Sequence, residues 1–167
     1  TGTQTIAGAK TFSSDLMVNG LTFGRGAGNE STNIAIGSTA LRVNSSGNWN
    51  TATGYQALYD NTTGALNTAN GLNALFRNTT GIWNTAIGVQ ALVTNTIGEK
   101  NTSTGVNSLY YNTSGSNNSA YGIQAMQSNT IGSNNTALGK SALFNNKSNK
   151  CEACIIFKAS PLFTWPL

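Results

Sequence analysis

Apolar and polar residues recur along most of this chain at a fixed interval of 17 residues, which is neither the helical period nor the two-residue alternation of a single strand. Seven copies follow one another without an insertion or a deletion. We name the recurring columns by residue type and order. The first Asn column is Asn33, Asn50, Asn67, Asn84, Asn101, Asn118 and Asn135. The first Gly column is Gly37, Gly54, Gly71, Gly88, Gly105, Gly122 and Gly139. The Leu column is Leu41, Leu58, Leu75, Leu92, Leu109, Met126 and Leu143. The second Asn column is Asn44, Asn61, Asn78, Asn95, Asn112, Asn129 and Asn146, and the second Gly column is Gly47, Gly64, Gly81, Gly98, Gly115 and Gly132.

The segments between these turn-forming residues are too short for helices. The pattern predicts two or three short strands in each unit, with corners at both Gly columns and at the second Asn column, because Gly and Asn tolerate positive φ. A unit of this kind is one coil of a solenoid, which is stable only when it stacks on its neighbours. We therefore predict an all-β fold, a parallel β-solenoid of seven 17-residue coils.

The chemistry of individual columns predicts which side chains lie inside. One column, here called the Ala column, always holds a small residue: Ala35, Ala52, Ala69, Ala86, Ser103, Ala120 and Ala137. Together with the Leu column it should fill the narrow interior of the coil. An amide column should form a ladder at the ~4.8 Å strand spacing; it consists of Thr39, Gln56, Asn73, Gln90, Asn107, Gln124 and Ser141.

The repeat divides the chain into three parts. Residues 1–28 form a connector, residues 29–149 the solenoid, and residues 150–167 a non-repeat tail or cap. The sequence GRGAG, residues 24–28, is expected to be a flexible joint. The tail carries Cys151 and Cys154, a CxxC that lacks the further ligands a zinc site needs, since the chain has no His.

The amino-acid composition argues against several classes of function. Only 8% of residues are charged, and the net charge of +4 forms no basic stripe, so we expect no nucleic-acid partner. We expect no membrane insertion either, because no apolar run is long enough to span a bilayer. Without His, and with its acidic residues scattered, the chain offers no nucleophile–base pair and no carboxylate pair. The sequence therefore predicts no enzyme, no catalytic residue, no cofactor and no metal.

Further apolar columns exceed what a thin coil can bury. They include Tyr55, Leu72, Val89, Val106 and Ile123 after the first Gly, Tyr59, Phe76, Val93, Tyr110 and Phe144 after the Leu, and the shared column Trp49, Leu66 and Trp83. An exposed apolar stripe usually marks an interface. We therefore favour a homotrimer over a monomeric solenoid. The candidate surface or interface aromatics are Tyr55, Tyr59, Trp83, Tyr110 and Tyr111.

The phrases NTATGYQALYDNTTG (residues 50–64) and NTAIGVQALVTNTIG (residues 84–98) resemble the head repeats of trimeric autotransporter adhesins and the related repeats of phage tail fibres. Residues 2–25, with Gln4-Thr5-Ile6, Lys10-Thr11-Phe12 and Val18 to Leu21, resemble a connector of tail-fibre shafts. The resemblance implies a left-handed β-roll in a trimer, on a virion tail or a bacterial surface. Such a fibre spaces and displays receptor-binding elements, and its partners are itself and a cell-surface glycan or receptor.

Two other functions remain open. Regular Thr ladders on a flat face can order water, which suggests an ice-binding solenoid. The first Thr column is Thr51, Thr68, Thr85, Thr102, Ser119 and Thr136, and the second is Thr62, Thr79, Thr96, Thr113 and Thr130. A solenoid lyase or glycosidase would need acidic residues clustered in a groove, and the sequence shows no such cluster.

Overall fold

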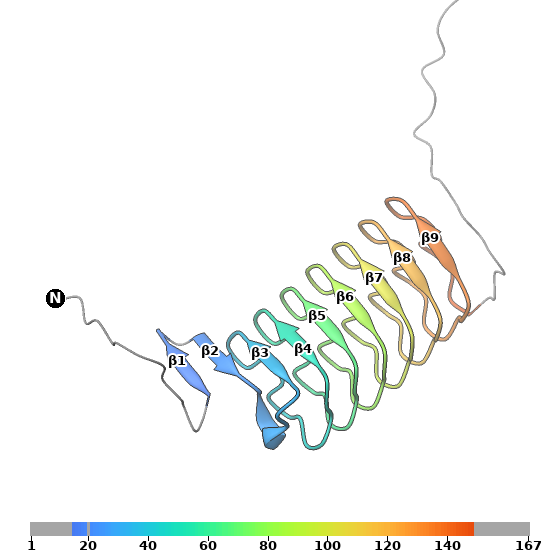
Figure 1. Cartoon of the computed structure of the whole chain (residues 1–167). Helices are drawn as coiled ribbons and strands as arrows, with labels where there is room; N and C mark the ends of the chain where they lie inside the picture. The colour runs from blue at the N-terminus through green and yellow to red at the C-terminus, as the bar shows by residue number, and fades with distance from the viewer. Residues whose placement is uncertain (1–14, 20, 149–167) are drawn as a thin grey trace, which may run out of the picture.

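The chain forms one nine-stranded sheet in which the strands follow one another in sequence order (Figure 1). The computed structural model describes residues 15–19 and 21–148. The strands are β1 (Leu16–Val18), β2 (Leu21–Gly24), β3 (Ile34–Ile36), β4 (Thr51–Thr53), β5 (Thr68–Asn70), β6 (Thr85–Ile87), β7 (Thr102–Thr104), β8 (Ser119–Tyr121) and β9 (Thr136–Leu138), with one 3₁₀ turn, η1 (Ala27–Asn29). Strands β3 to β9 pair in parallel, each shifted by 17 residues from the last. The predicted all-β parallel solenoid is therefore confirmed. Its handedness and its oligomeric state stay predictions.

Each coil contains one three-residue strand, so the prediction of two or three strands per coil is wrong. The rest of the coil still bonds to its neighbours through backbone groups. Leu58 N, for example, donates to Ala74 O at 3.0 Å. These segments are not strands because residues with positive φ interrupt them. Coil-to-coil bonding thus continues around the coil even where the backbone is not extended.

The corners also differ from the prediction. The first Gly column does turn at positive φ, between 118° and 143°, but neither the second Gly column nor the second Asn column does. Three other columns take positive φ instead, represented by Gln56 (57°), Leu58 (51°) and Trp83 (56°). This conformation costs a non-Gly residue roughly 1–2 kcal/mol. It persists because hydrogen bonds to the coils above and below fix the path of the backbone.

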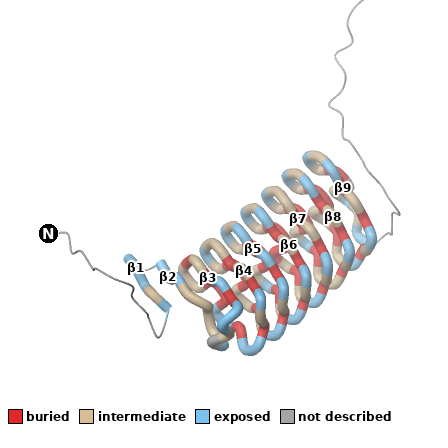
Figure 2. Tube along the Cα trace, viewed as in Figure 1, coloured by how far each residue is buried: buried red, intermediate tan, exposed pale blue. Residues whose placement is uncertain are grey.

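The interior contains the columns that the sequence placed there. The Ala column and the Leu column from Leu41 to Met126 are fully buried, and a second set of small residues, such as Ala57 and Ala74, packs beside them (Figure 2). In one coil Ser replaces Ala at both of these small-residue positions, and each Ser hydroxyl gives the other a hydrogen-bond partner. The Ser103 and Ser108 hydroxyls are hydrogen-bonded to one another, and Ser108 Oγ donates to Gly105 O.

The two Asn columns lie inside the coil and form its polar ladders. Along the second Asn column, from Asn61 to Asn129, each side-chain amide donates to the Oδ1 one coil earlier, as Asn78 Nδ2 does to Asn61 Oδ1 at 2.8 Å. Both Asn columns also donate to the carbonyls of the second Gly column: Asn67 Nδ2 and Asn78 Nδ2 both bond Gly81 O. Buried amides need such partners, and the repeat supplies them along the ladder until Asn129, whose Oδ1 is buried without a partner.

Gly is required in the second Gly column because neighbouring atoms leave no room for a Cβ, not because of its backbone φ. A Cβ on Gly81 would lie 2.4 Å from Asn78 Oδ1 and 2.5 Å from Gly98 O. The ladder that we predicted for the amide column does not form. Its side chains make no hydrogen bonds with one another in the described residues, and Asn73 Oδ1 and Asn107 Oδ1 are buried without a partner.

The N-terminal end of the stack is covered. Strand β2 pairs antiparallel with β3 and β1 with β2, so the hairpin belongs to the same sheet as the solenoid and protects its first edge. The expected flexible joint at residues 24–28 instead packs on the first coil, where Ala27 N donates to Leu41 O at 2.9 Å. The Asp15 carboxylate accepts a hydrogen bond from Arg25 N at 3.0 Å. Most of the predicted connector and the CxxC tail lie outside the described residues.

Candidate functional site

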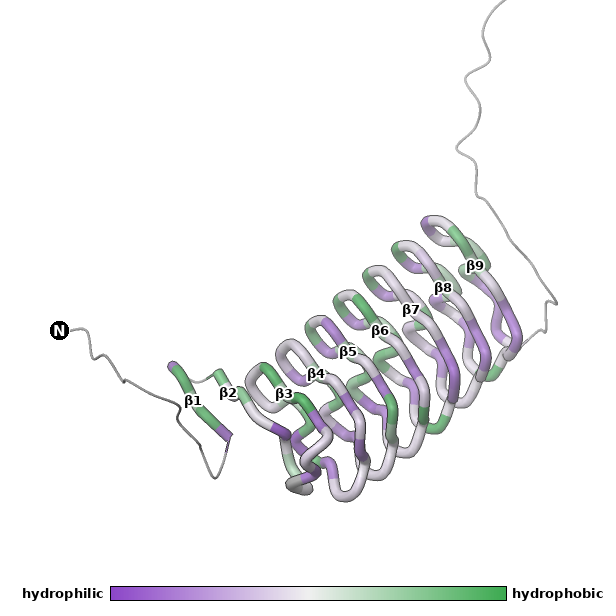
Figure 3. Tube along the Cα trace, in the orientation of Figure 1, coloured by the Kyte–Doolittle hydropathy of each residue, from purple (hydrophilic) through white to green (hydrophobic). Residues whose placement is uncertain are grey.

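Half of the large exposed apolar residues of the solenoid lie along the edge where the first Gly column turns the chain. The last residue of each strand points outward, the Gly turns, and the residue after it points outward again. We call this surface the Gly-corner edge; its large members are Tyr55, Leu72, Ile87, Val89, Val106, Tyr121, Ile123 and Leu138, each 39–51% exposed. No charged residue interrupts it before Lys140. In Figure 3 green segments lie at several of these corners, with white and purple segments between them.

The Gly is required at this corner for two reasons. Its φ is strongly positive, and a Cβ on Gly88 would lie 2.7 Å from Gly105 O in the next coil. The tight turn brings the residues on either side of the Gly close together, so two columns that the sequence separates form one continuous surface.

The five aromatics predicted from the sequence do not form one site. Tyr55 lies on the Gly-corner edge and is half exposed. Tyr59 stacks on Phe76 with ring centroids 5.2 Å apart. Tyr110 and Tyr111 contact each other edge to face, at 4.6 Å. Trp83 lies in a separate column.

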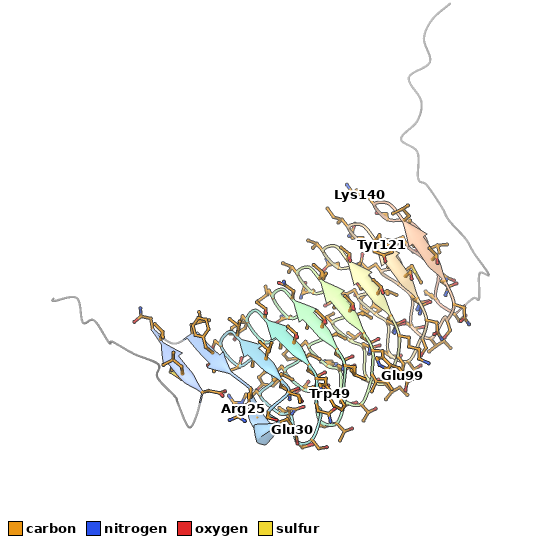
Figure 4. All side chains as sticks on the ribbon, in the orientation of Figure 1. Arg25, Glu30, Trp49, Glu99, Tyr121 and Lys140 are labelled. Atoms are coloured by element: carbon orange, nitrogen blue, oxygen red, sulfur yellow. The ribbon has the colours of Figure 1, made fainter. Side chains whose placement is uncertain are left out.

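Trp83 belongs to a column of three residues, and only Trp83 was among the candidate residues predicted from the sequence. We call Trp49, Leu66 and Trp83 the tryptophan column. All three are exposed, at 58%, 41% and 49%. Lys100, next in line, places its Nζ 5.1 Å from the Trp83 ring centroid. Figure 4 places Trp49 near one end of the strands and Tyr121 near the other, so the tryptophan column and the Gly-corner edge are separate surfaces. The shared repeat position of Trp49 and Trp83 was the signal that could have identified Trp49.

The two Thr columns have different environments. In the second, the hydroxyls donate to backbone carbonyls of the next coil, as Thr79 Oγ1 does to Thr96 O at 3.0 Å. In the first, the hydroxyls of Thr51, Thr68 and Thr85 face outward and bond no protein group in the described residues. Only the first column therefore presents free hydroxyls, and the ice-binding hypothesis now depends on it alone.

Residues 15–19 and 21–148 contain no group of three or more Cys, Asp or Glu side chains placed to hold a metal ion. No helix among them is long and apolar enough to cross a membrane.

No protein-family model matches the chain, and neither the curated proteins nor the solved structures give a match.

Proposed function

We propose that this chain is a structural and adhesive fibre segment of a phage tail or a bacterial surface, which assembles as a homotrimer outside the cell and displays receptor-binding elements. The observation that carries the proposal is the Gly-corner edge, a continuous uncharged apolar surface along a rigid stack of coils. A shaft and a means of self-association are the two parts that a fibre requires.

The shaft is rigid because every coil is bonded to the next by backbone groups and by buried Asn side chains. At a rise of ~4.8 Å per coil, the seven parallel strands span roughly 30 Å. Each coil contacts only its neighbours, so adding coils adds length without changing the cross-section. Such a unit is suited to spacing.

The Gly-corner edge has the size expected of an interface. Its exposed apolar side chains amount to on the order of 700 Å² per chain, close to the roughly 800 Å² per partner of a standard interface. Around a three-fold axis, each edge would contact the edges of two neighbours, and its apolar side chains would be removed from water. Three copies would also raise avidity for a receptor that each binds weakly.

The test is the mass in solution by light scattering. We expect about three times the 17.4 kDa of one chain. Leu72→Lys and Val106→Lys place charges in the middle of the edge and should each give monomers, because unpaired charges are costly to bury. Ile97→Lys is the matched control: Ile97 is 55% exposed but lies on another surface. A monomeric wild-type chain, or dissociation by Ile97→Lys as complete as by Val106→Lys, would refute the trimeric edge.

A further inference from the structure

The tryptophan column is an exposed aromatic surface that the fold itself does not need. Trp49 and Trp83 are about half exposed, and both adopt positive φ, 53° and 56°, which bulky residues rarely do. Later coils carry Asn117 and Asn134 at the same position and the same backbone conformation. Asn suits positive φ better than Trp. The two Trp residues therefore replace a better backbone choice without filling the core, which points to a role in binding.

The surroundings of the column are rich in hydroxyl groups, and at the Trp83 end the Lys100 Nζ lies over the ring, 5.1 Å from its centroid. The segments 44–53, 61–70 and 78–87, which contain the column and its neighbours, carry no charged residue. Two residues beyond each column member stands a residue of the first Thr column: Thr51, Thr68 and Thr85. Their hydroxyls point outward and are free of protein partners in the described part of the chain. An aromatic row with a row of hydroxyl groups suits a neutral ligand that has apolar faces and polar edges, and Lys100 at one end disfavours a cationic ligand.

The spacing of the Trp49 and Trp83 rings restricts the class of possible ligands further. Trp49 and Trp83 are two coils apart, which is about 10 Å at the ~4.8 Å rise. The backbone N–H of each is held by a hydrogen bond to the preceding coil, Trp49 N to Thr32 Oγ1 and Trp83 N to Ala65 O. In an extended β-1,4-linked glycan every second ring presents the same face, and the distance between such rings is about two coil steps.

We propose that the tryptophan column binds a neutral, extended β-1,4-linked polysaccharide lying along the shaft. Alternate sugar rings stack on Trp49 and Trp83, the intervening ring lies over Leu66, and the first Thr column hydrogen-bonds the ring hydroxyls. A second copy of the chain fits this surface less well, because the column is only three residues long and continues into Lys100 and Asn117. The proposal does not depend on the Gly-corner edge, which is a separate surface.

Isothermal titration calorimetry with cellohexaose and chitohexaose tests this proposal. Two rings separated by a third can be reached only by a trisaccharide or a longer chain. We therefore expect at least one hexasaccharide to bind roughly tenfold more tightly than the disaccharide of the same linkage, which reaches one Trp. Maltohexaose, whose α-1,4 linkages curve the chain, should bind no better than a disaccharide.

Trp49→Asn and Trp83→Asn are the informative variants, because Asn occupies the same backbone conformation in later coils and should preserve the fold. Each should weaken hexasaccharide binding roughly tenfold, to the level of the disaccharide. Tyr111→Asn is the matched control, since Tyr111 is 50% exposed on another surface and its own column holds Asn145. None of the three should change the mass in solution, which separates this test from that of the trimer. The proposal is overturned if neither hexasaccharide binds wild type at millimolar concentration, if maltohexaose binds equally well, or if the Trp variants bind as wild type does.

Discussion

The buried ladder of the second Asn column predicts a specific energetic response to substitution of Asn78. This side chain is fully buried in the middle of the stack. Its Nδ2 donates to Asn61 Oδ1 at 2.8 Å and to Gly81 O at 3.0 Å, and its Oδ1 accepts from Asn95 Nδ2 at 2.8 Å. Every polar atom of the amide is therefore used, and the consequences of removing donor and acceptor can be worked out separately.

Asn78→Ala removes three hydrogen bonds but leaves two of the partners bonded. Gly81 O keeps Asn67 Nδ2, and Asn95 Nδ2 keeps Gly98 O. Asn61 Oδ1 alone loses its side-chain donor and becomes a buried unsatisfied acceptor. With about 1 kcal/mol for each of the two hydrogen bonds whose partners stay bonded and about 1–3 kcal/mol for the orphaned Asn61 Oδ1, we expect a loss of roughly 3–5 kcal/mol in the free energy of unfolding.

Asn78→Asp has nearly the same shape but replaces the donor by an acceptor. At pH 7 the new carboxylate would face Asn61 Oδ1 and Gly81 O, both acceptors, inside the coil. We expect it to cost at least about 1 kcal/mol more than Asn78→Ala. Burial and facing acceptors raise the pKa of this carboxyl in the folded state above the unfolded value of about 3.9. The folded state therefore holds the proton more tightly, and the deficit relative to wild type should be smallest below about pH 4 and widen as pH rises through the folded pKa.

Urea unfolding followed by far-UV circular dichroism, at one protomer concentration and at several pH values, measures these differences. Asn145→Ala and Asn145→Asp are the matched controls, because Asn145 is exposed. They should change the free energy of unfolding by no more than about 0.5 kcal/mol. A variant that lowers the m-value instead of the midpoint would indicate that the coils on either side unfold separately. The ladder argument fails if Asn78→Asp is as stable as Asn78→Ala at pH 7, or if its deficit does not shrink in acid.

Three further predictions concern the glycines, the serines and the Thr columns. Gly88→Ala should lower the free energy of unfolding in urea by at least about 2 kcal/mol more than Gly139→Ala does. Both sites have positive φ, but only at Gly88 would the added Cβ lie within 4 Å of the next coil. Equal losses would show that backbone strain alone selects Gly. Ser103→Ala and Ser108→Ala should each lower the free energy of unfolding by about 1 kcal/mol. The double variant should lose less than the sum of the two, because the other coils hold Ala at both positions. Strict additivity in the double-mutant cycle would contradict a compensating pair. We expect no thermal hysteresis in a nanolitre osmometer, because the hydroxyls of the second Thr column donate to backbone carbonyls and the first column alone is a single row of free hydroxyls; measurable hysteresis would favour the ice-binding function.

The 17-residue period determined the stacking, its register and much of the interior. Identical coils can satisfy their backbone groups only by pairing each residue with its counterpart one period away, so Ala52 must lie on Ala69 and Leu58 on Leu75. Exposure of Tyr55, Trp49 and Trp83 also followed from the sequence, because a thin coil cannot bury them. The surplus column after the Leu differs, since Tyr59 and Tyr110 are half-buried and Val93 is buried. The fold class therefore needed no tertiary information.

The path of the chain within each coil was decided only by the tertiary structure. Gly and Asn tolerate positive φ, so the sequence favoured them as corners, yet Leu58, Gln56 and Trp83 adopt it, and Asn78 and Gly81 do not. Hydrogen bonds between coils fix the backbone at every step, and this collective restraint outweighs a local preference of about 1–2 kcal/mol per residue. The same path turned the Asn columns inward and joined two separate apolar columns across the first Gly column. It also left the hydroxyls of Thr51 and Thr85 without protein partners, which a linear pattern does not specify.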